Sequence, residues 1–122
     1  MKKNEKILVT GSYGFLAQNL IKYLLKRNFE VVGIDCKKTD QSVFDFTEYI
    51  NKKKFILLTI DIRDNKGIKN LLNKFSFNAC FHLAAITQVN QSNKFPKQTF
   101  DTNINGSINL LENFRKYKND VK

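Results

Sequence analysis

The 122-residue sequence has no tryptophan, and it has only one proline, one histidine and two cysteines. Neither cysteine has a second pair or a histidine at ligand spacing, so we expect no metal site. We expect Cys36 and Cys80 to be free thiols in a reducing compartment. No apolar run approaches the roughly 18 residues of a membrane span, and the charged N-terminus leaves no room for a signal peptide. These absences predict a cytoplasmic protein with no membrane partner.

Acidic residues are also scarce: 11 Asp and Glu stand against 21 Lys and Arg, which gives a formal net charge of +10. Such a charge could indicate a nucleic-acid partner. However, the lysines are spread along the chain, and their only run is at 52–54. No aromatic-interleaved basic strand is present. We therefore expect no nucleic-acid partner, although a basic surface would help to attract a phosphate-rich ligand.

Hydrophobic residues make up 42% of the chain, which fits a globular fold. Short apolar runs alternate with segments of helical spacing, and the last of these carries Phe100, Ile104, Ile108, Leu111 and Phe114 on the face that we expect to be buried. Asp64 is a good N-cap for the third helix. The spacing predicts strands at 6–10, 30–35, 55–60 and 79–85, helices at 15–28, 43–52, after 64 and at 97–117, and a polar loop at 86–96.

This alternation of strands and helices predicts a parallel sheet with helices on both faces, because every strand is apolar on both sides. Right-handed crossovers and a ligand crevice at the carboxyl ends of the strands give the strand order 3-2-1-4. The second and fourth strands then flank the first, about 10 Å apart. Cys36 and Cys80 are therefore too distant for a disulfide.

The clearest motif is a glycine turn that follows the first strand. Gly11, Gly14 and Ala17 give the spacing G-x-x-G-x-x-A between an apolar run and a helical pattern. Gly11 can adopt a positive φ, and Gly14 has no Cβ to block a phosphate. Backbone N–H groups and the helix dipole favour an anion at this point. The turn predicts a phosphate site, although a glycine turn with no ligand would have the same spacing.

Asp35 ends the second strand on an acidic side chain. A carboxylate at this place can accept hydrogen bonds from both hydroxyls of an adenosine ribose, which a 2′-phosphate would disrupt. Asp35 therefore favours NAD over NADP. Lys37 and Lys38 follow closely and could hold a 2′-phosphate, so NADP remains the alternative.

The third and fourth strands also end on residues that suit a nucleotide. Asp61 and Ile62 end the third strand, where they either read an adenine edge or begin a helix. Ala84 and Ala85 end the fourth strand, where their small side chains would let a dinucleotide lie flat. His82 stands inside this apolar strand, and we expect it to be a hydrogen-bonded core residue and not a catalyst.

These motifs together resemble one known family. They lie, in chain order, at 10–17, 35, 61–62, 82–85 and 103–112. In combination they resemble the N-terminal half of the extended short-chain dehydrogenase/reductase family, the NAD-dependent nucleotide-sugar epimerases and 4,6-dehydratases. The resemblance covers essentially the whole chain. It implies a Rossmann-type α/β fold in which residues 1–122 form one NAD-binding unit, truncated before a fifth strand and without a substrate domain.

The resemblance also implies roles for individual residues. Residues 11–16 would bind the NAD pyrophosphate, and Asp35 would bind the adenosine ribose. Residues 61–62 would contact adenine, residues 84–85 would line the cofactor cleft, and residues 87–92 would lie near the nicotinamide and the sugar. The expected cofactor-binding residues are Gly11, Ser12, Tyr13, Gly14, Phe15, Leu16, Asp35, Asp61, Ile62, Ala84, Ala85 and Asn103, the last as a structural asparagine.

The sequence departs from the family pattern in two places. Ala17 replaces the usual third glycine, which such turns tolerate. The family's catalytic Ser or Thr on a fifth strand and its Tyr-x-x-x-Lys helix do not follow. Tyr49 and Lys53 match the Tyr-x-x-x-Lys spacing, but they precede the third strand and would face away from the crevice. We therefore expect no catalytic residue.

The expected function is the NAD-binding part of a nucleotide-sugar epimerase or 4,6-dehydratase that is inactive alone. It would take a nucleotide sugar only if a C-terminal half completed it. Two alternatives remain: a non-catalytic NAD-binding sensor or scaffold module, and one chain of a split enzyme. Either could self-associate or bind a partner chain through the open edge of the fourth strand.

Overall fold

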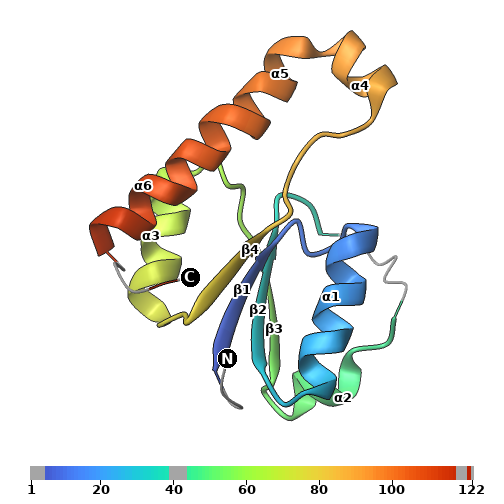
Figure 1. Ribbon diagram of the computed structural model, residues 1–122, viewed down its shortest axis with the longest axis vertical. Coiled ribbons are helices and arrows are strands. Elements are labelled where there is room, and N and C mark those ends of the chain that lie inside the picture. Colours follow the sequence, from blue (N-terminus) through green and yellow to red (C-terminus); the bar gives the residue numbers. More distant parts are fainter. Residues whose placement is uncertain (1–4, 39–43, 118–120, 122) are drawn as a thin grey trace.

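The structure is a computed structural model that describes residues 5–38, 44–117 and 121. Figure 1 shows one central sheet with helices on both of its faces. Within these described residues, no helix is both long and apolar enough to cross a membrane. The elements are, in chain order, β1 (Lys6–Thr10), α1 (Phe15–Lys26), β2 (Glu30–Asp35), α2 (Thr47–Asn51), β3 (Phe55–Thr59), α3 (Asn65–Lys74), β4 (Ala79–His82), α4 (Val89–Lys94), α5 (Pro96–Phe100), the π-helical segment η1 (Asp101–Gly106) and α6 (Ser107–Tyr117).

The four strands are parallel and lie in the order β3-β2-β1-β4, which confirms the predicted α/β topology. Ile7 of β1 pairs with Val31 of β2 on one side and with Ala79 of β4 on the other. β1 is therefore internal, and its residues Ile7, Leu8 and Val9 are completely buried. Because parallel strands end at the same edge of a sheet, the segments that follow the four strands converge there.

Each face of the sheet has its own apolar core. Figure 1 shows α1 on one face and α3 and α6 on the other. Alternate residues of a strand point to opposite faces, so Ile7 and Val9 pack toward α1 whereas Leu8 packs toward α3. Each fully buried aliphatic side chain contributes about 1.5–3 kcal/mol relative to an exposed one. The buried apolar residues of the helices are Ala17, Ile21, Leu24 and Leu25 in α1, Ile68, Leu71 and Leu72 in α3, and Leu110 in α6.

The turn that leads α1 back into β2 is built on Asn28, which has a φ of 64°. Asn28 donates its N–H to the Leu25 carbonyl at 3.0 Å, and Phe29 donates to the Leu24 carbonyl at 3.2 Å. These two bonds satisfy carbonyl groups that the end of the helix would leave unpaired. The chain leaves the helix after Lys26, slightly before the predicted end, and enters β2 as expected.

Both cysteines are free thiols, as predicted. Cys36 follows β2 and Cys80 lies in β4, and β1 separates these strands. Burial raises the pKa of Cys80 to about 12. Burial and the neighbouring Asp35 carboxylate raise the pKa of Cys36. Both groups are therefore protonated at neutral pH, which is not the state of a reactive cysteine.

The last helix is continuous from α5 through η1 to α6, as predicted, but its expected buried face is wrong. Phe100, Ile104, Ile108 and Leu111 are 64%, 48%, 53% and 66% exposed. Phe114 alone of the expected stripe packs, partly buried, against the α3 side of the core. The apolar stripe at this spacing therefore faces away from the sheet.

A second stripe on the same helix faces the body of the protein instead. It contains Gly106, Leu110 and Asn113, which are buried. Asn113 donates its side-chain N–H to the Asn65 side-chain oxygen at 2.8 Å and to the Asn109 carbonyl at 2.8 Å. Buried amides need such partners, and this face provides them. The number of apolar residues on each face of the helix therefore does not predict which face packs against the protein.

Several other boundaries differ from the prediction. Residues 86–96, expected to be a loop, contain the short helix α4, in which Ser92 donates its hydroxyl to the Gln88 carbonyl. β4 ends at His82 and not at 85, because the next two N–H groups bond to the Thr10 side chain. The helix expected at 43–52 is shorter in the structure: α2 spans only Thr47–Asn51, residues 44–46 are not helical, and position 43 lies outside the described residues.

Candidate functional site

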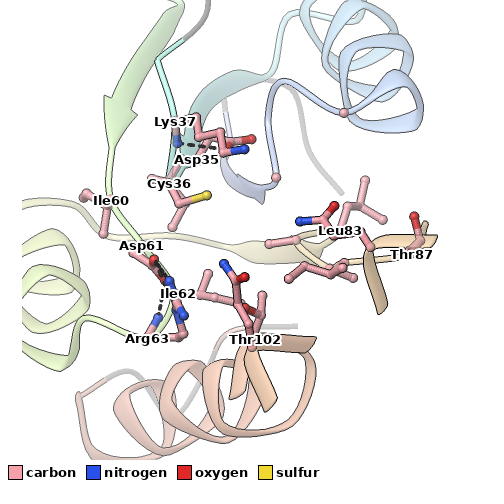
Figure 2. A pocket seen from close by; sticks show the side chains of 18 of the residues that line it. Asp35, Cys36, Lys37, Ile60, Asp61, Ile62, Arg63, Leu83, Thr87 and Thr102 are labelled. Atoms are coloured by element: carbon pink, nitrogen blue, oxygen red, sulfur yellow. Dashed lines mark hydrogen bonds and ion pairs between the residues drawn. The ribbon is translucent and has the colours of Figure 1, made fainter. Parts of the chain in front are cut away.

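A cavity of about 300 Å³ lies at the carboxyl ends of the four strands. Figure 2 shows that its walls come from segments far apart in the sequence: the end of β2, the loop after β3, the loop after β4, and the last helix. The strand order creates this cavity. β4 lies on one side of β1, whereas β2 and β3 lie on the other side, so the segments that follow these strands leave a crevice between them. It is the crevice in which open α/β sheets bind ligands.

The glycine turn forms one wall of the cavity. Gly11 has a φ of 69°, and a Cβ at this position would lie 2.8 Å from the backbone of Ala84. Gly14 begins α1 in an extended conformation and donates its N–H to the Gly11 carbonyl at 2.8 Å. Among the described residues, no side chain caps the start of α1, and the first turn of the helix has no acidic residue. The first N–H groups of the helix are thus left for an anion.

Asp35 joins the glycine turn to the segment that follows β2. One carboxylate oxygen accepts the Tyr13 N–H at 3.1 Å, and the other accepts the Lys37 N–H at 3.2 Å. The carboxylate lies at the rim of the cavity (Figure 2). Each oxygen accepts one of these backbone bonds, and the Cys36 thiol also hydrogen-bonds to this carboxylate. The lone-pair capacity that remains can accept a hydroxyl of a ligand.

Asp61, Ile62 and Arg63 form the wall that follows β3. Ile62 is 4% exposed and supports the loop from below. The Arg63 guanidinium binds the Asp61 carboxylate, with a shortest distance of 2.7 Å from Nη2 to Oδ2. These hydrogen bonds lower the pKa of Asp61, so its carboxyl group is ionised at neutral pH. The wall therefore presents a fixed hydrogen-bond acceptor.

The wall that follows β4 is held by a hydroxyl and an amide. The Thr10 hydroxyl oxygen accepts the N–H groups of Leu83 and Ala84, both at 3.1 Å. Asn103 bonds to both backbone groups of Ile86: its oxygen accepts the N–H at 2.8 Å, and its Nδ2 donates to the carbonyl at 2.9 Å. These bonds hold an extended segment of small residues along the cavity.

The comparisons with known proteins agree with this geometry. A family model described as GDP-mannose 4,6 dehydratase matches residues 8–122. The chain belongs to this family of NAD-dependent epimerases and dehydratases. The UDP-glucose 4-epimerase of Pisum sativum is 34% identical over 121 residues, which cover 93% of this chain and 34% of that relative.

Similar solved structures share the fold. The X-ray structure of Pal from Bacillus thuringiensis has 36% identity and a TM-score of 0.83, over 95% of this chain and 36% of that chain. The UDP-glucose-4-epimerase from Stenotrophomonas maltophila, solved with bound NAD and formylated UDP-arabinopyranose, has 30% identity and a TM-score of 0.77, over 93% of this chain and 34% of that chain. The present chain thus spans about one third of the length of these relatives.

The structure brings many of the expected cofactor-binding residues together. Ser12 is instead buried behind the turn, close to Gly33, and its hydroxyl has no hydrogen-bond partner among the described residues. Phe15 and Leu16 point their side chains into solvent, so only their backbone N–H groups serve the first turn of α1. The expected residues that line the cavity are Gly11, Gly14, Asp35, Asp61, Ile62, Ala84 and Ala85.

Several residues that line the cavity were not predicted from the sequence. Cys36, Arg63 and Leu83 lie within two residues of predicted site residues, and this adjacency was a usable signal. Gln98 and Thr102 line the cavity from the last helix (Figure 2 labels Thr102). No local pattern marks these two, because their place depends on how that helix approaches the sheet.

His82 is hydrogen-bonded as expected, but it is exposed and does not belong to the core. Both lone pairs of the Thr10 hydroxyl are used by backbone N–H groups, so the hydroxyl donates to His82 Nδ1 at 2.7 Å. His82 Nε2–H then donates to the Ser107 hydroxyl at 2.8 Å, which donates to the Asn103 carbonyl at 2.7 Å. This chain of donors requires a neutral imidazole.

We expect the free energy of unfolding to fall as the pH drops below 6.5. Partial desolvation of the imidazole ring lowers the pKa of His82 below its usual 6.5, so the unfolded chain takes up the proton at a higher pH than the folded chain does. Stability then increases with pH up to 6.5. Urea unfolding of the wild type and His82→Gln at several pH values measures this effect. An equally steep pH dependence in His82→Gln would contradict the prediction.

Tyr49 and Lys53 do not lie in the cavity. Tyr49 belongs to α2 and packs, partly buried, against the α1 side of the core. Lys53 lies in the turn that leads into β3. Both therefore lie near the start of β3, at the opposite end of the sheet from the cavity (Figure 1). Tyr49 and Lys53 thus match the spacing of the family's Tyr-x-x-x-Lys motif but do not lie at the place in the fold that the motif occupies in the family.

Proposed function

We propose that these residues are the NAD-binding part of a nucleotide-sugar epimerase or 4,6-dehydratase. One observation carries the proposal: a single cavity gathers the glycine turn, the Asp35 carboxylate and the Asp61 carboxylate at the ends of three neighbouring strands. Related structures support it, since the Stenotrophomonas maltophila and Bifidobacterium longum epimerases contain NAD or NAD⁺.

The residues present fit a dinucleotide. The uncapped first turn of α1 would hold the pyrophosphate, and Gly14 leaves space for it because no Cβ stands there. Asp35 would accept the ribose hydroxyls, and Asp61 with the Ile62 N–H would face adenine. Ala84 and Ala85 would let the nicotinamide half cross the end of β4. NAD, when bound, supplies a hydride acceptor for the transient oxidation of a sugar hydroxyl.

We further propose that residues 1–122 bind NAD without turning over a sugar. The described residues that line the cavity include no tyrosine that could transfer a proton. The family pattern provides that group on a segment beyond the matched third of the relatives. Binding and chemistry would then depend on different parts of the complete enzyme.

Calorimetric titration of NAD into the purified chain tests the proposal. We expect binding with a stoichiometry of one, because the cavity is a single site. With NAD and UDP-glucose together, we expect no conversion to UDP-galactose, measured by chromatography. An absence of NAD binding would refute the cofactor assignment, and conversion of the sugar would refute the inactivity.

A partner chain at β4 is the second candidate, in the form of a scaffold module or a split enzyme. The observation in its favour is that β4 lies at the edge of the described sheet and pairs only with β1 there. An exposed strand edge can pair with another strand. A sedimentation coefficient that rises with protein concentration would favour this candidate, and a constant monomer value would argue against it.

A further inference from the structure

Arg63 connects the adenine side of the cavity to the last helix. Its Nε and Nη2 atoms bind Asp61 at 3.0 Å and 2.7 Å, and its backbone N–H donates to Asp61 Oδ1 at 2.9 Å. Its remaining terminal nitrogen, Nη1, reaches Asp101 Oδ2 at 3.3 Å. Asp101 in turn accepts the Asn105 side-chain N–H at 3.0 Å. The guanidinium therefore lies between two carboxylates on different elements.

The same helix also fixes the backbone beside Arg63. Asn109 donates its side-chain N–H to the Ile62 carbonyl at 2.7 Å. Gly106 lies so close that a Cβ there would be 2.7 Å from the Ile62 side chain. These contacts hold the loop, whereas Arg63 holds the carboxylate. Figure 2 shows Arg63 beneath Asp61, on the side away from Asp35.

This arrangement determines what Asp61 can recognise. Asp61 Oδ1 already accepts the backbone N–H and the Nε–H of Arg63, whereas Oδ2 accepts the Nη2–H and only a longer contact from Nε at 3.2 Å. The capacity left for a donor from the cavity is therefore on Oδ2. The 6-amino group of adenine is such a donor, whereas the 6-oxo group of hypoxanthine is an acceptor and would be repelled. A carboxylate free to rotate would lose part of this selectivity, because hydrogen bonds weaken steeply with misalignment.

We propose that Arg63, braced by Asp101, is a positioning residue that aims the Asp61 carboxylate at the base and so makes the cavity select a 6-amino purine. This inference rests on the proposed function, because it assumes that the dinucleotide lies in this cavity. Arg63 and Asp61 are 36% and 29% exposed, so their ion pair contributes little to folding. The role is therefore expected to appear in selectivity and not in stability.

The test compares NAD with nicotinamide hypoxanthine dinucleotide by calorimetry. We expect the wild type to prefer NAD by about tenfold or more, since one hydrogen bond to a charged group accounts for that ratio. In Arg63→Met the preference should fall to about threefold or less, because the backbone N–H of Ile62 still distinguishes the two bases. Asp101→Asn should give an intermediate ratio, and Arg63→Lys should restore it only in part.

Arg115→Met is the matched control, because it removes an exposed arginine that pairs with Glu112 away from the cavity. Its ratio should equal that of the wild type, and urea unfolding should show the same midpoint for all variants. Equal weakening of both dinucleotides in Arg63→Met, with an unchanged ratio, would overturn the inference and leave the proposed function intact. If the wild type binds neither dinucleotide, the proposed function fails and the inference fails with it.

Discussion

Gly11→Ala is expected to lower the free energy of unfolding by about 2 to 5 kcal/mol. A non-glycine residue at the φ of 69° found here costs about 1–2 kcal/mol. The new Cβ would also lie 2.8 Å from two backbone atoms of Ala84 and 2.9 Å from the Leu83 carbonyl oxygen. Backbone cannot move aside as a flexible side chain does, and overpacking of this kind costs about 1–3 kcal/mol. Urea unfolding monitored by circular dichroism measures the change.

Gly14→Ala is the matched control for this prediction. Gly14 has a φ of −65° and a ψ of 152°, which any residue can adopt, and a Cβ there would meet only the Gly11 carbonyl oxygen at 3.1 Å. Its loss of stability should therefore be about 1 kcal/mol or less. If Gly11→Ala were as stable as Gly14→Ala, the close approach of the glycine turn to the β4 segment would be incorrect.

Asp35→Ala is expected to weaken NAD binding by about 10- to 100-fold. The carboxylate would lose its hydrogen bonds to the ribose hydroxyls, and one hydrogen bond to a charged group accounts for about 1.5–3 kcal/mol. The same change removes a negative charge that would repel a 2′-phosphate, and Lys37 remains nearby. The NAD-to-NADP affinity ratio should therefore approach one. Calorimetric titration with both dinucleotides measures the ratio.

Two further variants make this result interpretable. Asp35→Asn removes the charge but keeps one oxygen acceptor for the Tyr13 or Lys37 N–H, so its binding should be intermediate. Glu112→Gln removes an exposed carboxylate from α6 and should bind NAD like the wild type. Equal NAD affinity in the wild type and Asp35→Ala would show that the ribose does not lie at Asp35.

Sequence patterns were sufficient for the sheet, because its strands are buried on both faces. Runs such as Ile7–Leu8–Val9 have no polar residue that could face solvent, so they predict internal parallel strands whatever their neighbours are. β1 and β2 match their expected bounds, and the strand order follows from the handedness of the connections. The ends of the strands then located Gly11, Asp35 and Asp61 at one edge.

The last helix shows where such patterns are insufficient. Its two possible inner faces both have helical spacing, and the more apolar one, with Phe100 and Leu111, is exposed. The other face is chosen by partners that lie far away in the sequence: Asn103 meets Ile86, and Asn109 meets the Ile62 carbonyl. These contacts depend on how far apart the elements lie in the folded protein, and the spacing of residues within one helix does not contain that information.

Hydrophobic spacing and the position of glycine thus determined the α/β fold and the edge of the sheet that holds the cavity, because burial of strands and turn conformation are local requirements. Tertiary structure alone decided how the walls of the cavity are held. The Arg63 guanidinium is held by a hydrogen bond to Asp101, 38 residues away in the chain. The segment after β4 is held by a hydrogen bond from the Leu83 N–H to the Thr10 hydroxyl. Hydrogen bonds between distant segments need exact distances, and only the packed chain supplies them.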